Sequence, residues 1–147
     1  RLLKQCQTLN ISILQELPKD LSSYSLFVDA IFGFSFEPPV RGVWVSIINE
    51  VNAVSSKHNI PVVAVDLPSG WDVDKGKLDG KDSIALNPSM IVSLSAPKKC
   101  TLSWEGVHYV GGRFLTPDVI EKYQVKLPDY PHTQQVMRID TIKHSKI

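Results

Sequence analysis

Pro61-Val-Val-Ala-Val-Asp66 and Leu26-Phe-Val-Asp-Ala-Ile-Phe32 are the two stretches that decide the fold. Each is a short, almost continuous apolar run that carries one aspartate, which is typical of strands buried on both faces of a parallel sheet. Between them, Val43 to Lys57 repeats apolar residues at the spacing of one helical face. A strand, a helix and a second strand in this order predict a right-handed crossover unit. We therefore expect an α/β fold built on a parallel sheet.

Further elements are predicted on both sides of this unit. They are a helix over 1–9, a short strand over 11–14, strands over 90–95 and 108–110, and a helix that begins at Thr116-Pro117-Asp118. The stretch from Asp66 to Met90 is rich in Gly, Asp and Lys, and a loop of that length is more often functional than idle. No N-cap precedes the first helix, so we expect that the N-terminal part of the fold is missing. Residues 1–127 are then a partial domain, and 128–147 a surface-running or frayed extension.

Composition and charge exclude several classes of function. Sixteen basic and fifteen acidic residues give a net charge of +1 without a basic stripe, so nucleic acid is not an expected partner. No apolar run approaches the ~20 residues that span a bilayer, and no signal peptide is present, so we expect a soluble chain. The two cysteines, Cys6 and Cys100, are far apart and are expected to be reduced thiols. The four histidines are scattered, so no zinc site is expected.

Asp29 and Asp66 are the candidate functional residues, because ligands of open parallel sheets bind beyond the carboxyl ends of the strands. Asp66 ends a strand and precedes Leu67-Pro-Ser-Gly70, a turn that would expose its carboxylate. Alternatively, Asp66 only stabilises that turn with an Asx hydrogen bond. Asp29 lies in an apolar strand, where its charge needs either a cation or several hydrogen-bond donors from the protein. The spacing of the residues leaves these alternatives open.

Two glycine-containing segments are weaker candidates. The turn Gly33-Phe-Ser-Phe36 could offer backbone N–H groups to an anion such as a diphosphate. Gly111-Gly112-Arg113 could do the same, although a tight turn after the strand 108–110 is the favoured interpretation.

Four motifs resemble one known family. Val28-Asp-Ala-Ile-Phe-Gly-Phe-Ser-Phe36, Val63-Ala-Val-Asp-Leu-Pro-Ser-Gly-Trp-Asp-Val73, Ser95-Ala-Pro-Lys98 and His108-Tyr-Val-Gly-Gly-Arg-Phe114 resemble, in order and spacing, the NAD(P)H-hydrate epimerases. These are the YjeF N-terminal domain proteins, and some members are known as apolipoprotein A-I-binding proteins. The resemblance covers about 5–138, nearly the whole chain.

The resemblance implies a Rossmann-like, three-layer fold and an isomerase that interconverts the R and S forms of hydrated NADH and NADPH. It implies a potassium ion held by Asp29 and Ser69, and makes Asp66 both the catalytic residue and a substrate contact. It also implies that one loop contacts the substrate, with the residues Gly33, Phe34, Ser35, Phe36, Glu37, Pro38 and Pro39. A homodimer, an apolipoprotein A-I-like partner and a cytoplasmic or mitochondrial location, with secretion as a further option, follow from the same resemblance.

Two departures from the family pattern accompany the resemblance. The family's Asn- and Gly-rich segment, which helps bind nucleotide and potassium, lies upstream of this chain, so we expect the chain alone to be inactive. The loop reads Glu37-Pro38-Pro39, where prolines lack N–H donors and the glutamate would repel a diphosphate. This loop slightly favours an alternative function, a non-catalytic protein-binding module of the same fold. The intact Asp29, Asp66 and Ser69 favour the epimerase.

Overall fold

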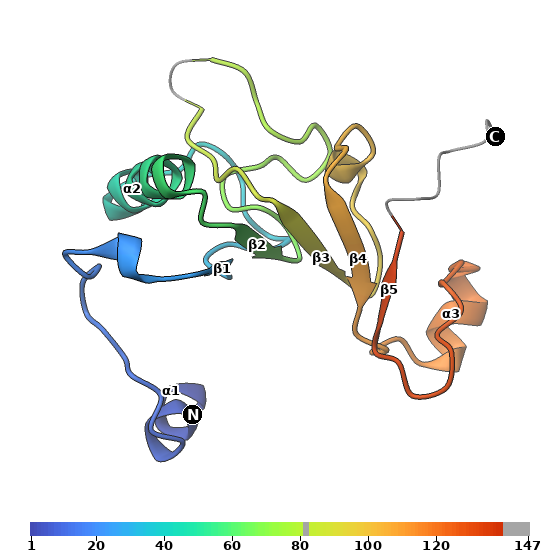
Figure 1. The fold of residues 1–147 in the computed structure, drawn as a ribbon. Coiled ribbons are helices and arrows are strands. Elements are labelled where there is room, and N and C mark those ends of the chain that lie inside the picture. The colour runs from blue at the N-terminus through green and yellow to red at the C-terminus, as the bar shows by residue number, and fades with distance from the viewer. Residues whose placement is uncertain (81–82, 140–147) are drawn as a thin grey trace.

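A five-stranded sheet forms the centre of the computed structural model, which describes residues 1–80 and 83–139 (Figure 1). Its strands are β1 (Phe27–Asp29), β2 (Val62–Val65), β3 (Met90–Leu94), β4 (Val107–Gly111) and β5 (Val136–Arg138), in that spatial order. The first four strands are parallel, and β5 pairs with β4 in the antiparallel direction. The predicted α/β fold with a parallel sheet is therefore confirmed.

In the described part of the chain, three α-helices and two short 3-10 helices accompany the sheet. They are α1 (Leu2–Thr8), η1 (Leu21–Ser23), α2 (Val43–His58), η2 (Lys99–Thr101) and α3 (Pro117–Tyr123). The crossover helix α2 ends at Asn59, which adopts the left-handed conformation, and Lys57 and His58 lie in the last turn beside the negative end of the helix dipole. Its Ile48 is fully buried in a cluster with Val40 and Leu86. No helix in 1–80 or 83–139 has both the length and the apolar character needed to cross a bilayer.

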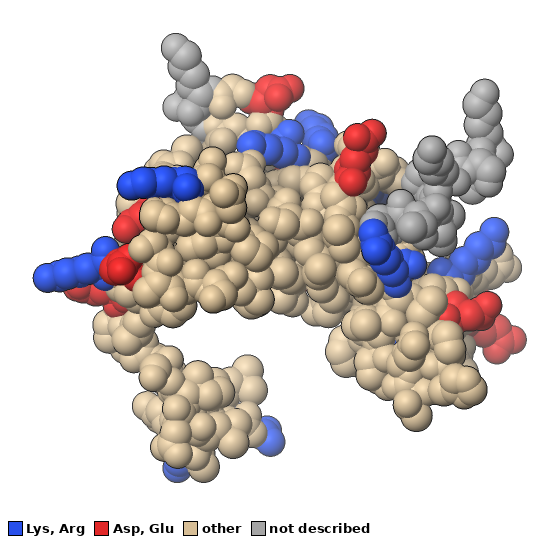
Figure 2. All heavy atoms as spheres, in the orientation of Figure 1, with Lys and Arg blue, Asp and Glu red and all other residues tan. Residues whose placement is uncertain are grey.

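The sheet has one well-covered face. Because side chains alternate along a strand, Val62, Ala64, Ile91, Ser93, His108 and Val110 share a face, and all six are buried. On the opposite face, Val28 is 61% exposed and Leu94 is 38% exposed. Figure 2 shows charged side chains of both signs around the margins of the molecule, with a largely uncharged area between them. The core of the described residues therefore lies mainly on one side of the sheet.

Several sequence predictions need correction. Ile11 to Leu14 form no strand, because no neighbouring strand supplies hydrogen bonds to them. In the run Leu26–Phe32, only Phe27–Asp29 form a strand, β1, at the edge of the sheet. This strand is not buried on both faces, because Val28 points to the exposed face. The expected patternless tail is wrong for Val136–Arg138, which pair with β4 as β5. The rest of the predicted extension from 140 onward lies outside the described residues.

Candidate functional site at the carboxyl edge of the sheet

Asp29 and Ser69 form a buried hydrogen-bonded pair at the end of β1. The Ser69 hydroxyl donates to Asp29 Oδ1 at 2.6 Å, and the Ser69 backbone N–H donates to Asp29 Oδ2 at 2.7 Å. A third donor is the backbone N–H of Ile31, 3.3 Å from Oδ1. Ser69 Oγ in turn accepts the backbone N–H of Phe32 at 3.0 Å. The pair thus joins the end of β1 to the loop that follows β2.

Burial dominates the electrostatics of Asp29. The residue is only 4% exposed, and this desolvation raises the pKa of its carboxyl group above the ordinary value of 3.8. The hydrogen bonds from Ser69 and Ile31 lower the pKa but do not offset the burial. A carboxylate in this position would gain from a nearby cation, as its place in an apolar strand suggested.

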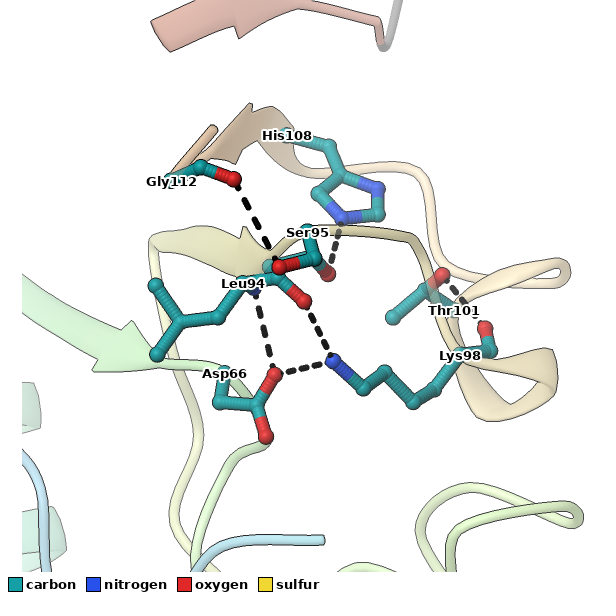
Figure 3. Close-up of polar contacts among 8 residues, drawn as sticks. Asp66, Leu94, Ser95, Lys98, Thr101, His108 and Gly112 are labelled. Atoms are coloured by element: carbon teal, nitrogen blue, oxygen red, sulfur yellow. Dashed lines mark hydrogen bonds and ion pairs between the residues drawn. The ribbon is translucent and has the colours of Figure 1, made fainter. Parts of the chain in front are cut away.

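Asp66 lies at the end of the neighbouring strand β2 and is held differently. Its Oδ1 accepts the backbone N–H of Leu94, the last residue of β3, at 3.2 Å, and forms an ion pair with Lys98 (Figure 3). No hydrogen bond of the described residues uses its Oδ2. The carboxylate therefore bridges two strand ends rather than forming the Asx turn that was the structural alternative.

The predicted substrate loop begins at the Asp29 and Ser69 pair, because the Phe32 N–H donates to Ser69 Oγ. The loop then turns with a hydrogen bond from Phe36 N–H to Gly33 O at 3.0 Å, and its Phe34 is 65% exposed. Its far end, Pro38 and Pro39, lines a pocket of about 330 Å³ together with Gly70 and the residues 78–80 and 83–84. The loop therefore lies beside the loop that follows β2.

The structure joins some predicted site residues directly and separates others. Hydrogen bonds connect Asp29, Ser69 and the start of the loop, whereas the side chain of Asp66 bonds, within the described residues, to the end of β3 and to Lys98. All these contacts lie along one edge, where β1, β2 and β3 end. Sequence reasoning missed Lys98 as the partner of Asp66, although the motif Ser95-Ala-Pro-Lys98 had been singled out. A cation close behind a predicted strand end was the available signal.

Gly70 fixes the loop that carries Ser69. Its φ is +94°, and a Cβ placed on it would lie 2.2 Å from the backbone oxygen of Ile84. We expect Gly70→Ala to lower the free energy of unfolding by about 2–4 kcal/mol, since left-handed strain and overpacking add. Gly33→Ala is the matched control, because nothing lies within 4 Å of its Cβ position and its φ is not positive. Urea unfolding measures both, and equal stability of the two variants would contradict the assigned packing.

The fold and this edge define a class of protein, a parallel-sheet α/β protein with acidic and hydroxyl side chains gathered where neighbouring strands end. The chain belongs to the family described as YjeF-related protein N-terminus, which matches residues 1–100. Its relatives include the NAD(P)H-hydrate epimerase of Caenorhabditis elegans, 37% identical over 95% of this chain and 57% of that protein. The NAD(P)H-hydrate epimerase of Caenorhabditis briggsae is 39% identical over 92% of this chain and 56% of that protein.

A solved structure supports the same relationship. The crystal structure of a yeast protein matches with a TM-score of 0.78 and 35% identity, over 94% of this chain and 58% of that chain. The chain thus spans a little over half the length of the relatives it matches.

Proposed function

We propose that the protein containing this chain interconverts the R and S forms of hydrated NADH and NADPH. The observation that carries the proposal is the carboxylate of Asp66, which is held through Oδ1 at the carboxyl edge of the sheet and whose Oδ2 makes no hydrogen bond with the described residues. The two worm relatives are named NAD(P)H-hydrate epimerase, which supports the choice of substrate.

The chemistry follows from the substrate. Hydrated NAD(P)H carries a hydroxyl group on the saturated ring carbon next to the ring nitrogen. Protonation of that hydroxyl lets the C–O bond break, water departs, and the nitrogen lone pair forms a C=N bond with positive charge on nitrogen. Water then adds to the other face of the carbon and loses a proton. Asp66 can serve in both steps by sharing its proton with water, as general acid when the hydroxyl group leaves and as general base when water returns, and its negative form stabilises the cationic intermediate.

Potassium is the proposed cofactor, held by Asp29 and Ser69. Both side chains offer oxygen, which hard cations prefer, and the raised pKa of the buried Asp29 carboxyl group marks a site where a cation would be favourable. The carboxyl and hydroxyl oxygens already accept protein hydrogen bonds, so these two residues would supply only part of a coordination shell. Within the described residues, no cluster of three or more His, Cys, Asp or Glu could hold a metal ion. The proposal therefore relies on a carboxylate, a hydroxyl group and further oxygens of other kinds.

The loop 33–39 has two possible roles, contact with the substrate or binding of another protein. Glu37 is exposed, and Pro38 and Pro39 line the pocket beside Gly70, where they offer no N–H to a diphosphate. This arrangement favours, for the loop alone, a protein-binding role. The homodimer, the apolipoprotein A-I-like partner, the cellular compartment and the boundary between 1–127 and 128–147 stay predictions.

The direct test is epimerisation by the full-length protein. Pure R-hydrate of NADH should approach the equilibrium mixture of R and S forms faster with the protein than without it, followed by chromatography of the two forms. The same protein heated to unfold it is the control. An unaccelerated reaction over a range of potassium concentrations would favour the non-catalytic module instead.

A further inference from the structure

We infer that Lys98 is a positioning residue for epimerisation, which fixes the carboxylate of Asp66 so that Oδ2 faces the substrate. The inference rests on the proposed function and assigns a role to a residue that the resemblance leaves without one. It is carried by the contacts that surround the Asp66 carboxylate in Figure 3.

Lys98 has two acceptors, and both lie at the ends of neighbouring strands. Its ammonium group pairs with Asp66 Oδ1 and donates to the backbone oxygen of Leu94 at 3.0 Å. Leu94 contacts both members of the pair, because its backbone N–H also donates to Asp66 Oδ1. The side chains of Lys98 and Asp66 are 14% and 15% exposed, so water competes little for the pair. Oδ1 is therefore fully engaged, and only Oδ2 is available to a ligand.

The backbone holds the lysine in place. The carbonyl oxygen of Lys98 accepts the Thr101 hydroxyl at 2.8 Å and the Thr101 N–H at 3.0 Å, so Lys98 is fixed at the start of η2. On the other side, Ser95 donates its N–H to Gly111 O at 2.7 Å, at the end of β4. The segment from Ser95 to Lys98, which places the lysine beside Asp66, is thus hydrogen-bonded to β4 at one end and to η2 at the other.

Strained backbone marks the same place. Asp66 has a φ of +70° and Ser95 a φ of +63°, although neither residue is glycine. Such conformations cost about 1–3 kcal/mol each and gather at functional sites, where the surrounding structure enforces them. Asp66 is itself a member of the ion pair, and Ser95 directly follows Leu94 at the end of β3.

The neighbouring lysine provides the matched control. Lys99 is also paired, with Asp74 at 3.4 Å, but the side chains are 76% and 62% exposed. Exposed pairs contribute little, because solvent screens the charges and the side chains lose entropy. Lys99→Met removes the same charge from the adjacent position without touching Asp66, so it controls for net charge and for disturbance of η2.

The test compares Lys98→Met, Lys98→Arg and Lys99→Met in the full-length protein with the R-hydrate of NADH as substrate. We expect Lys98→Met to lower kcat roughly 10- to 100-fold, since a misplaced reacting group costs that much. KM should change by less than about threefold, because binding is retained while an interaction needed in the transition state is lost. Lys98→Arg, which keeps a cationic donor, should recover most of the lost kcat, and Lys99→Met should match the wild type. Melting temperatures are measured for all three.

Each result bears on the inference separately from the proposed function. A wild-type protein without activity overturns the proposed function and this role of Lys98 together. An active wild type with unchanged kcat in Lys98→Met overturns the positioning role and leaves the proposed function standing. Equal losses in Lys98→Met and Lys98→Arg, each with a lowered melting temperature, would make Lys98 a structural residue and also overturn it.

Discussion

Asp66→Asn is expected to lower the rate of R to S conversion of hydrated NADH by roughly 100-fold or more, as loss of a general acid-base group typically does. The amide has nearly the same shape as the carboxyl group, so it can still accept the N–H of Leu94 through its oxygen. It cannot, however, give or take the proton that the departing and returning hydroxyl group needs. Initial rates at saturating substrate measure the effect.

The control for this variant is another aspartate of the same long loop. Asp74 lies eight positions further along the chain, and its side chain is 62% exposed. Asp74→Asn should therefore leave the rate unchanged while altering the net charge by the same amount. Wild-type turnover of Asp66→Asn would refute the acid-base assignment, and a loss in both variants would indicate a general charge effect.

The order of the core elements was predictable because their signals are local. The helix Val43–His58 repeats apolar residues at helical spacing over most of its length, and the strand Val62–Val65 is a continuous apolar run. The structure places both elements within one or two residues of the prediction. The helix α3 starts at Pro117 after Thr116 as predicted, although the Thr116 side chain makes no capping hydrogen bond. The first turn of α3 is held instead by backbone hydrogen bonds from Val119 and Ile120 to the Thr116 oxygen.

The failures of prediction concern partners that sequence patterns do not encode. Ile11 to Leu14 look like a strand, but a strand needs a neighbour, and the edge next to β1 is not paired with them. Conversely, β5 has only three residues and forms because β4 offers a free edge to a segment that arrives from the opposite direction. Such short antiparallel additions depend on tertiary contacts.

The candidate site was partly predictable for the same reason. Asp66 ends one apolar run and Asp29 lies within another. Because ligands of open parallel sheets bind beyond the carboxyl ends of the strands, the sequence predicted that both aspartates lie at one edge of the sheet. The hydrogen bonds between Asp29 and Ser69 span forty positions, and the pair of Asp66 with Lys98 spans thirty-two. Which donor serves which carboxylate depends on the register of β1, β2 and β3, and the sequence pattern does not specify that register.

Potassium is expected to stabilise the full-length protein against heating more than lithium does at equal ionic strength. An ion present at ten times its Kd and bound only by the native state adds about 1.4 kcal/mol. For a domain of this size, that gain corresponds to about 3–6 °C in melting temperature. Asp29→Ala should abolish the difference between the two salts, although it also lowers stability in both, because the donors on Ser69 and Ile31 lose their acceptor. Asp74→Ala, at an exposed position, should retain the difference.

The pH dependence of this potassium effect follows from the raised pKa of the Asp29 carboxyl group. Without a bound cation, burial favours the protonated form, so the stability contributed by Asp29 is fully present below the unfolded pKa and is lost as pH rises through the folded pKa. A cation binds the ionised form and opposes that loss, so the stabilisation by potassium should be larger near pH 7 than at about pH 4, where protons compete with the ion for the carboxylate. Melting curves in potassium and lithium salts at both pH values, for the wild type and Asp29→Ala, measure the effect. A difference between the salts that persists in Asp29→Ala, or that stays constant as the pH falls, would place the potassium site elsewhere in the protein.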